Sequence, residues 1–189
     1  MEARLRVLWF SWTMMVPFLW FSALARRTFV IPDKARPQLV LGGVSMISGI
    51  VLGIWTSQHG TYVQWLWAAG AILAICSVVL YESARRIVTG RGFCSVLSGE
   101  VPQAVCTVGP YRYIRHPVYT SYLLAFLAFV VAFPGLQSAA VFIVNAVFFV
   151  FAAAHEERTI AHSPLAQAYA AYRRQAGMIL PRFGRPRGA

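Results

Sequence analysis

The sequence predicts an all-α, polytopic helical membrane protein with about five transmembrane helices, and three observations lead to this prediction. Of its 189 residues, 58% are hydrophobic and only 12% are charged, and the mean hydropathy is +0.59, which is more apolar than a soluble domain. The apolar residues fall in runs of about 20, the length with which a helix crosses a hydrocarbon core of about 30 Å. The segments between these runs hold nearly all of the charge. We therefore expect residues 1–189 to form one membrane domain.

Five apolar runs are long enough to be expected as membrane spans. Pro134 and Gly135 separate the last two runs by a tight turn, which predicts a helical hairpin. The second run is rich in glycine, which favours close packing against a neighbouring helix. The five runs are residues 7–25, 39–57, 62–81, 118–133 and 136–154, and the glycines are Gly42, Gly43, Gly49 and Gly53.

The basic residues predict the orientation of the chain. Fifteen of the 17 lysines and arginines fall in the segments 26–38 and 82–117 or after the last span, and only Arg4 and Arg6 precede the first span. Because cytoplasmic loops carry an excess of Lys and Arg, we expect these three segments in the cytoplasm and the N-terminus outside. The same topology accounts for the net charge of +11, and we expect no nucleic-acid partner, because no basic groove with interleaved aromatic residues accompanies the charge.

Polar residues after the fifth span indicate a further helix on the cytoplasmic side. Glu156 and Glu157 close the span, and Ser163 with Pro164 resembles an N-cap followed by a first-turn proline. The helix that follows would place four residues on one face: Leu165, Tyr169, Tyr172 and Ala176. We expect this face to lie against the cytoplasmic ends of the spans.

The three cysteines predict neither a disulfide framework nor a metal centre. Cys76, Cys94 and Cys106 form no CxxC pair and are odd in number, which favours reduced thiols. Their spacing to His116 matches no zinc pattern. We therefore expect no metal in the site.

The densest group of polar and aromatic residues lies at the entrance to the fourth span and runs Gly-Pro-Tyr-Arg-Tyr-Ile-Arg-His-Pro-Val-Tyr over residues 109–119. Pro117 turns His116 away from helical geometry and itself suits the first helical position. The exposed N–H groups of a helix start, with Arg115 beside them, would bind an anion such as a carboxylate. The alternative is that Arg112 and Arg115 only mark the membrane boundary, while the tyrosines form an interfacial belt.

This run, followed by Glu156-Glu157 after a helical hairpin and then by Tyr169, Tyr172 and Pro181, resembles the isoprenylcysteine carboxyl methyltransferase family and its phospholipid methyltransferase relatives. The similarity covers roughly residues 95–183. It implies a methyltransferase-like catalytic region at 95–189, preceded by generic membrane helices at 1–94. It also implies S-adenosylmethionine as the cofactor, bound on the cytoplasmic side.

The resemblance implies roles for individual residues. His116, Arg115 and Glu157 would be catalytic. The cofactor has a carboxylate suited to a helix N-terminus, an ammonium and ribose hydroxyls suited to a glutamate, and a sulfonium suited to tyrosine faces. Its implied contacts are Gln103, Ala104, Val105, Cys106, Tyr111, His116, Pro117, Val118, Tyr119 and Glu156.

One departure from the family leaves the methyl acceptor open. Carboxyl-methylating members carry an arginine about one turn before the glutamates, where this chain reads Ala-Ala-Ala-His over residues 152–155. His155 and Arg158 are therefore expected to contact the substrate in its place. The acceptor would be a prenylcysteine-type carboxylate, the head group of a membrane lipid, or another lipophilic molecule.

Two functions of other classes remain open. Membrane sterol reductases share a similar C-terminal architecture and use NADPH, which would make the chain an oxidoreductase. A non-catalytic scaffold that binds anionic membrane lipids through its basic face is the other alternative. The Arg-His-Pro-Val-Tyr run at 115–119 favours the methyltransferase.

Overall fold

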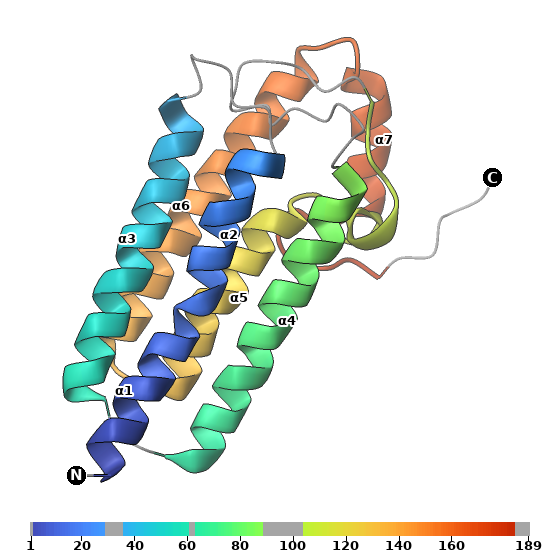
Figure 1. The fold of residues 1–189 in the computed structure, drawn as a ribbon. Coiled ribbons are helices and arrows are strands. Elements are labelled where there is room, and N and C mark those ends of the chain that lie inside the picture. The colour runs from blue at the N-terminus through green and yellow to red at the C-terminus, as the bar shows by residue number, and fades with distance from the viewer. Residues whose placement is uncertain (1, 29–35, 61–62, 89–103, 184–189) are drawn as a thin grey trace.

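The computed structural model describes residues 2–28, 36–60, 63–88 and 104–183. Within these residues the chain is helical, with one isolated β-bridge and no strand, which confirms the all-α prediction for the described part. The first six α-helices form an elongated bundle and the seventh lies at one end of it (Figure 1). The elements are α1 Glu2–Met14, α2 Val16–Thr28, α3 Arg36–His59, α4 Gln64–Val88, the 3₁₀ turn η2 Gly109–Arg112, α5 Pro117–Ala132, α6 Leu136–Ala161 and α7 Ala166–Gln175.

Three helical stretches are long and apolar enough to cross a membrane: Glu2–Leu24, α4 and α6. They correspond to the first, third and fifth predicted spans. The fourth predicted span is the shorter apolar helix α5, and the second coincides with α3. The chain is thus a helical protein suited to a membrane, and the five-span topology and its sidedness stay predictions.

The first predicted span is interrupted, because α1 ends at Met14 and α2 begins at Val16. Pro17 has no N–H, and its ring would meet the carbonyl four residues earlier in a continuous helix. The N–H groups of Phe18 and Leu19 both bond to the carbonyl of Met15, at 3.1 and 3.2 Å. The two pieces continue one another along the bundle (Figure 1).

Glycines let α3 approach this broken helix closely. A Cβ on Gly49 would lie 2.9 Å from Cγ of Phe18, and a Cβ on Gly53 would collide with the sulfur of Met15. Close packing is therefore confirmed at these two glycines. At Gly42 and Gly43 an added Cβ would meet nothing within 4 Å among the described residues, so the close packing expected there is not seen in that part of the chain.

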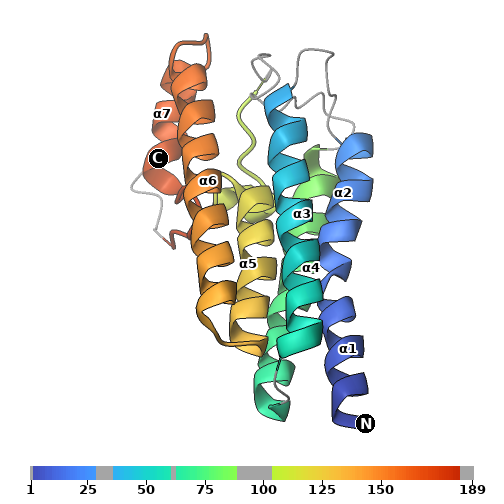
Figure 2. The same ribbon diagram turned by 90° about the vertical axis from the view of Figure 1, so that its left-hand side faces the viewer.

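Helix α5 lies inside the bundle between α4 and α6 (Figure 2). Phe126 and Phe129 are fully buried on it, and Gly70 of α4 packs so tightly that an added Cβ would lie 2.7 Å from Cβ of Ala132. The predicted hairpin is confirmed, since α5 ends at Ala132 and α6 begins at Leu136. This packing fixes the start of α5 relative to α4 and α6.

Helix α6 continues to Ala161, well beyond the predicted end of the span at 154. Hydropathy detects the apolar part of a helix and not its end, and charged residues are good helix formers. The extension projects past the start of α5 (Figure 2). It therefore carries Glu156 and Glu157 on rigid helical backbone.

The predicted helix after α6 exists, but it begins later than expected. Ser163 and Pro164 lie in a turn, and Leu165 occupies the N-cap of α7. The Ser163 hydroxyl accepts the Leu165 N–H at 3.1 Å, inside that turn. The predicted face is confirmed, because Tyr169, Tyr172 and Ala176 are buried together with Ile160 of α6, and Leu165 packs against them.

Candidate functional site

The segment that follows α7 pairs with the loop that precedes α5. The Arg115 N–H donates to the Gly177 carbonyl at 2.7 Å, the His116 N–H donates to the Met178 carbonyl at 3.1 Å, and the Gly177 N–H donates to the Tyr113 carbonyl at 3.0 Å. A side chain at position 177 would collide with the Leu180 carbonyl. Main-chain hydrogen bonds thus fix Arg115 and His116 where α5 begins.

Three further contacts fasten this loop and the segment after α7 to the helices. Gly109 opens η2 with a φ of 59°, a left-handed conformation that favours glycine, and an added Cβ there would collide with Ile87 of α4. The Tyr172 hydroxyl of α7 donates to the Tyr111 carbonyl at 2.6 Å. The Thr120 hydroxyl donates to the Ile179 carbonyl at 2.7 Å, which ties the segment after α7 to α5.

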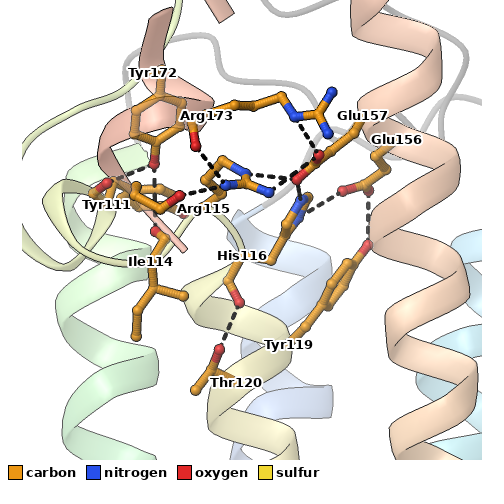
Figure 3. A network of polar contacts seen from close by, with 11 residues as sticks. Tyr111, Ile114, Arg115, His116, Tyr119, Thr120, Glu156, Glu157, Tyr172 and Arg173 are labelled. Atoms are coloured by element: carbon orange, nitrogen blue, oxygen red, sulfur yellow. Dashed lines mark hydrogen bonds and ion pairs between the residues drawn. The ribbon is translucent and has the colours of Figure 1, made fainter. Parts of the chain in front are cut away.

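His116 lies between the two glutamates of α6 (Figure 3). Its Nδ1 is 3.3 Å from an oxygen of Glu156, and its Nε2 is 3.2 Å from an oxygen of Glu157. Ionised carboxylate oxygens only accept hydrogen bonds, so both ring nitrogens must carry a proton to satisfy both contacts. The geometry therefore favours the imidazolium form.

The electrostatic surroundings of His116 agree with this geometry. Burial disfavours the charged ring, but the hydrogen bonds and negative charges of Glu156 and Glu157 outweigh burial and raise the pKa of His116 above its usual 6.5. The geometry and the charges around the ring thus both favour the buried cation. In this form it has no free lone pair with which to accept a proton.

Glu157 is surrounded by donors on both oxygens. One oxygen accepts from Arg115 Nε at 2.7 Å and from His116, and the other lies 3.1 Å from Nε of Arg173 on α7. The side chains of Arg115 and Glu157 are 8% and 6% exposed. Such a pair is stable only when hydrogen bonds satisfy the remaining donors and acceptors.

The Nη1 group of Arg115 finds its hydrogen-bond acceptors at the end of α7. Its Nη1 donates to the carbonyls of Arg173, at 3.3 Å, and of Ala176. These carbonyls belong to the last turn of the helix, which has no intrahelical donors and carries a partial negative charge. Arg115 therefore joins Glu157 of α6 to the C-terminus of α7.

Glu156 has a different neighbourhood, formed by aromatic rings. The Tyr119 hydroxyl donates to Glu156 at 2.7 Å. The Tyr119 ring stacks on His116 with a centroid distance of 5.5 Å and an interplanar angle of 3°, and it also lies 5.3 Å from the ring of Phe149. A carboxylate, an imidazolium and an aromatic face thus meet at the first turn of α5.

The structure brings together five of the residues that the sequence singled out: Arg115, His116, Tyr119, Glu156 and Glu157. Pro117 is buried at the start of α5 and Val118 packs against the main core. These assignments as catalytic or cofactor-binding residues stay predictions.

The other predicted contacts lie around this group. Burial raises the pKa of Tyr111, and the charges of Cys106, Tyr172 and Glu156 raise it further. Cys106 is half-buried. Val105 packs against the buried face of α7, and Ala104 is exposed. Gln103 lies outside the described residues, as does Cys94.

His155 and Arg158, the predicted substrate contacts, are exposed on α6. The buried face of this part of α6 holds Ala153, Glu156, Glu157 and Ile160. His155 and Arg158 are three positions apart and share the neighbouring exposed stripe. Neither is among the residues labelled in the polar network of Figure 3.

Sequence reasoning missed Arg173 and the role of Thr120. The sequence indicates only a cytoplasmic charge at Arg173, although this residue pairs with Glu157. Its place on the same helix as the buried Tyr169 and Tyr172, four residues after Tyr169 and next to Tyr172, was the available signal. Nothing in the sequence indicates that Thr120 holds a carbonyl almost sixty residues away.

Comparisons with curated proteins and with solved structures find no significant match. The family model described as phospholipid methyltransferase matches residues 65–163. The matched segment begins in α4 and ends just after α6, so it contains the loop before α5, His116 and both glutamates. It covers more than half of the chain, and the chain therefore belongs to the phospholipid methyltransferase family of membrane methyltransferases.

Proposed function

We propose that this protein transfers a methyl group from S-adenosylmethionine to a lipophilic acceptor that reaches the site from the membrane. The family supports methyltransferase activity. The observation that supports this site most is the contact of Glu156 with both Tyr119 and His116 at the first turn of α5. We further propose that this end of the bundle faces the cytoplasm, with the N-terminus outside.

The residues at this end fit the chemistry of the proposed cofactor. A carboxylate such as Glu156 suits an ammonium group or ribose hydroxyls, and the rings of Tyr119 and Tyr111 suit a sulfonium. Pro117 starts α5, and the N–H groups of Val118 and Tyr119 precede the first N–H that bonds back into this helix start, that of Thr120. Such N–H groups suit a carboxylate. These residues would hold S-adenosylmethionine, which when bound supplies a methyl group activated by its positive sulfur.

The chain's own contribution to such a transfer is alignment and exclusion of water. Displacement at a methyl group needs the nucleophile and the leaving group in line, in a site that water does not enter. His116 cannot accept a proton while both of its nitrogens donate to glutamates. We infer that His116 holds the two carboxylates in place and that an acceptor which must lose a proton passes it to another group.

We propose that the methyl acceptor is a prenylcysteine-type carboxylate or the head group of a lipid. His155 and Arg158 stay the proposed contacts to its polar part, because they are exposed on the part of α6 that also carries the glutamates. An acceptor that lies among lipid chains would reach this exposed stripe directly. A water-soluble donor would reach the same site from the aqueous side.

Binding and transfer assays on the full-length protein in lipid nanodiscs test this proposal. We expect saturable binding of S-adenosylmethionine and transfer of labelled methyl to one component of a membrane lipid extract, which mass analysis would identify. Binding of NADPH without S-adenosylmethionine would replace the proposal with a reductase. Binding of neither molecule would favour a lipid-binding scaffold.

A further inference from the structure

We propose that Arg173 of α7 is a positioning residue for the cofactor site and acts through Glu157. The inference rests on the proposed function, and it adds a residue outside the segment that the family model matches, which ends at 163. The Nε of Arg173 lies 3.1 Å from Glu157, on the oxygen that His116 does not use. Any influence of Arg173 on His116 through this contact therefore passes through the carboxylate of Glu157.

The two carboxylate oxygens of Glu157 have different partners. One oxygen receives His116 and the Nε of Arg115, and the other receives Arg173 and, at 3.3 Å, the Nη2 of Arg115. A carboxylate held on both oxygens cannot rotate about its terminal bond without losing a contact. Arg173 therefore contributes to the orientation in which Glu157 faces the His116 ring.

Arg173 also links α7 to the buried ion pair through its backbone. The Arg173 carbonyl accepts a hydrogen bond from Arg115, while the Arg173 side chain contacts Glu157. The backbone and the side chain of Arg173 thus both connect α7 to the buried Arg115–Glu157 pair. Tyr172, the preceding residue, holds the loop at Tyr111 and Ile114 through its hydroxyl. Tyr172 thus fixes α7 to the backbone of the loop before α5, and Arg173 fixes α7 to Arg115 and Glu157.

The charges around His116 make the consequence measurable. The groups that surround it are Glu156 and Glu157 from α6, Tyr119 from α5, the neighbouring Arg115, and Arg173 behind Glu157. Removal of the Arg173 charge leaves Glu157 with one cation fewer. His116 then holds its proton more tightly, so its titration moves to higher pH while its orientation becomes less defined.

Arg174 offers a matched control on the same helix. Both arginines are exposed at the last turn of α7, and Arg173 has a contact with Glu157 while its side chain is 53% exposed. Replacement of either by methionine removes a charge and keeps an unbranched apolar chain of similar reach. Because both residues are exposed, we expect both variants to fold.

The test is a double-mutant cycle for S-adenosylmethionine binding to full-length protein in nanodiscs. For a partly exposed ion pair we expect R173M to weaken affinity about two- to five-fold, R173K to restore most of it, and R174M to leave it unchanged. If Arg173 acts through Glu157, R173M has no further effect in an E157Q background. An equal loss in both backgrounds, or no loss from R173M, overturns the inference.

A second readout does not need the cofactor. With ¹⁵N-labelled histidine, the ring shifts of His116 report its titration, assigned by the H116Q variant. We expect R173M to move this titration to higher pH and R174M to leave it in place; an unmoved titration in R173M contradicts the inference. Absence of S-adenosylmethionine binding by the unmodified protein would reject the proposed function instead, and this titration would still decide the role of Arg173.

Discussion

Two Glu–Arg clusters lie at the same end of the bundle and differ in what they connect. In the first, Glu82 of α4 accepts from Arg85, one turn later on the same helix, at 2.7 Å, and from the indole of Trp20 on α2 at 2.9 Å. In the second, Glu157 joins Arg115, His116 and Arg173 from the loop and α7. The first cluster lies near the end of α4 and adds one contact to α2, whereas the second connects α6, the loop before α5 and α7.

Burial separates the two clusters further. The side chains of Glu82 and Arg85 are 16% and 22% exposed, against 6% and 8% for Glu157 and Arg115. Water can replace a partner lost from the first cluster, but it reaches the second poorly. The Glu82–Arg85 pair should therefore contribute little to stability. The fold should depend on the buried Glu157–Arg115 pair, because loss of either partner leaves an uncompensated charge.

The largest predicted effect is the loss of Glu157. Glu157→Ala leaves Arg115 and His116 as buried cations without their shared anion, which we expect to cost about 3–5 kcal/mol of unfolding free energy. Unfolding in detergent, followed by circular dichroism, measures this cost. Glu82→Ala is the matched comparison, and a loss from Glu157→Ala no greater than from Glu82→Ala would remove the distinction between the clusters.

Tyr119→Phe should weaken the cofactor site without unfolding the protein. The variant removes a hydrogen bond to a carboxylate, worth about 1.5–3 kcal/mol, and keeps the ring that stacks on His116. We expect S-adenosylmethionine affinity to fall about ten-fold or more, with the helical content unchanged. Isothermal titration of both proteins checks this, and unchanged affinity would place the binding carboxylate elsewhere.

The second cluster should also make stability depend on pH. Because the folded pKa of His116 is raised above 6.5, its contribution is complete below about pH 6.5 and is lost as the pH rises through the folded pKa. The contribution is about 1.4 kcal/mol for each pH unit that separates the folded pKa from the unfolded one. Unfolding free energies measured from pH 6 upward should therefore fall in the unmodified protein. His116→Gln should flatten this part of the curve, and an equally steep fall in that variant would contradict the assignment.

The smallest effect is expected at the first cluster. Glu82→Gln keeps the shape of the side chain and weakens a local pair, so we expect at most about 1 kcal/mol of lost stability. Affinity for S-adenosylmethionine should not change. A loss of affinity comparable to that of Tyr119→Phe would show that the two clusters are coupled.

The bundle was predictable from sequence where apolar runs and turn residues agree. Pro134 and Gly135 located the hairpin between α5 and α6, and the apolar pattern located α3 and α4. The break before α2 was missed although Pro17 signals it, because hydropathy averages over the interruption. The added turns of α6 were missed because the charged residues there mark the end of its apolar part and not the end of the helix.

The site was partly predictable for a different reason. The Arg-His-Pro-Val-Tyr run and the Glu-Glu pair stand out as polar residues beside apolar spans, and the structure brings them into contact. The side chains of Arg115, His116 and Tyr119 have partners more than thirty residues along the chain, and such pairing leaves no periodic signal. In the sequence, Arg173 differs from Arg174 only by its spacing of four residues from Tyr169, and its pairing with Glu157 is visible only once α7 is placed against α6.

The most direct test of the central claim compares one carboxylate from each cluster. Binding of S-adenosylmethionine to the unmodified protein, to Glu156→Gln and to Glu82→Gln would be measured in nanodiscs at neutral pH, with unfolding free energies as the control. We expect saturable binding that Glu156→Gln weakens at least ten-fold and Glu82→Gln leaves unchanged. Equal binding by all three proteins would contradict the assignment of the site to the start of α5.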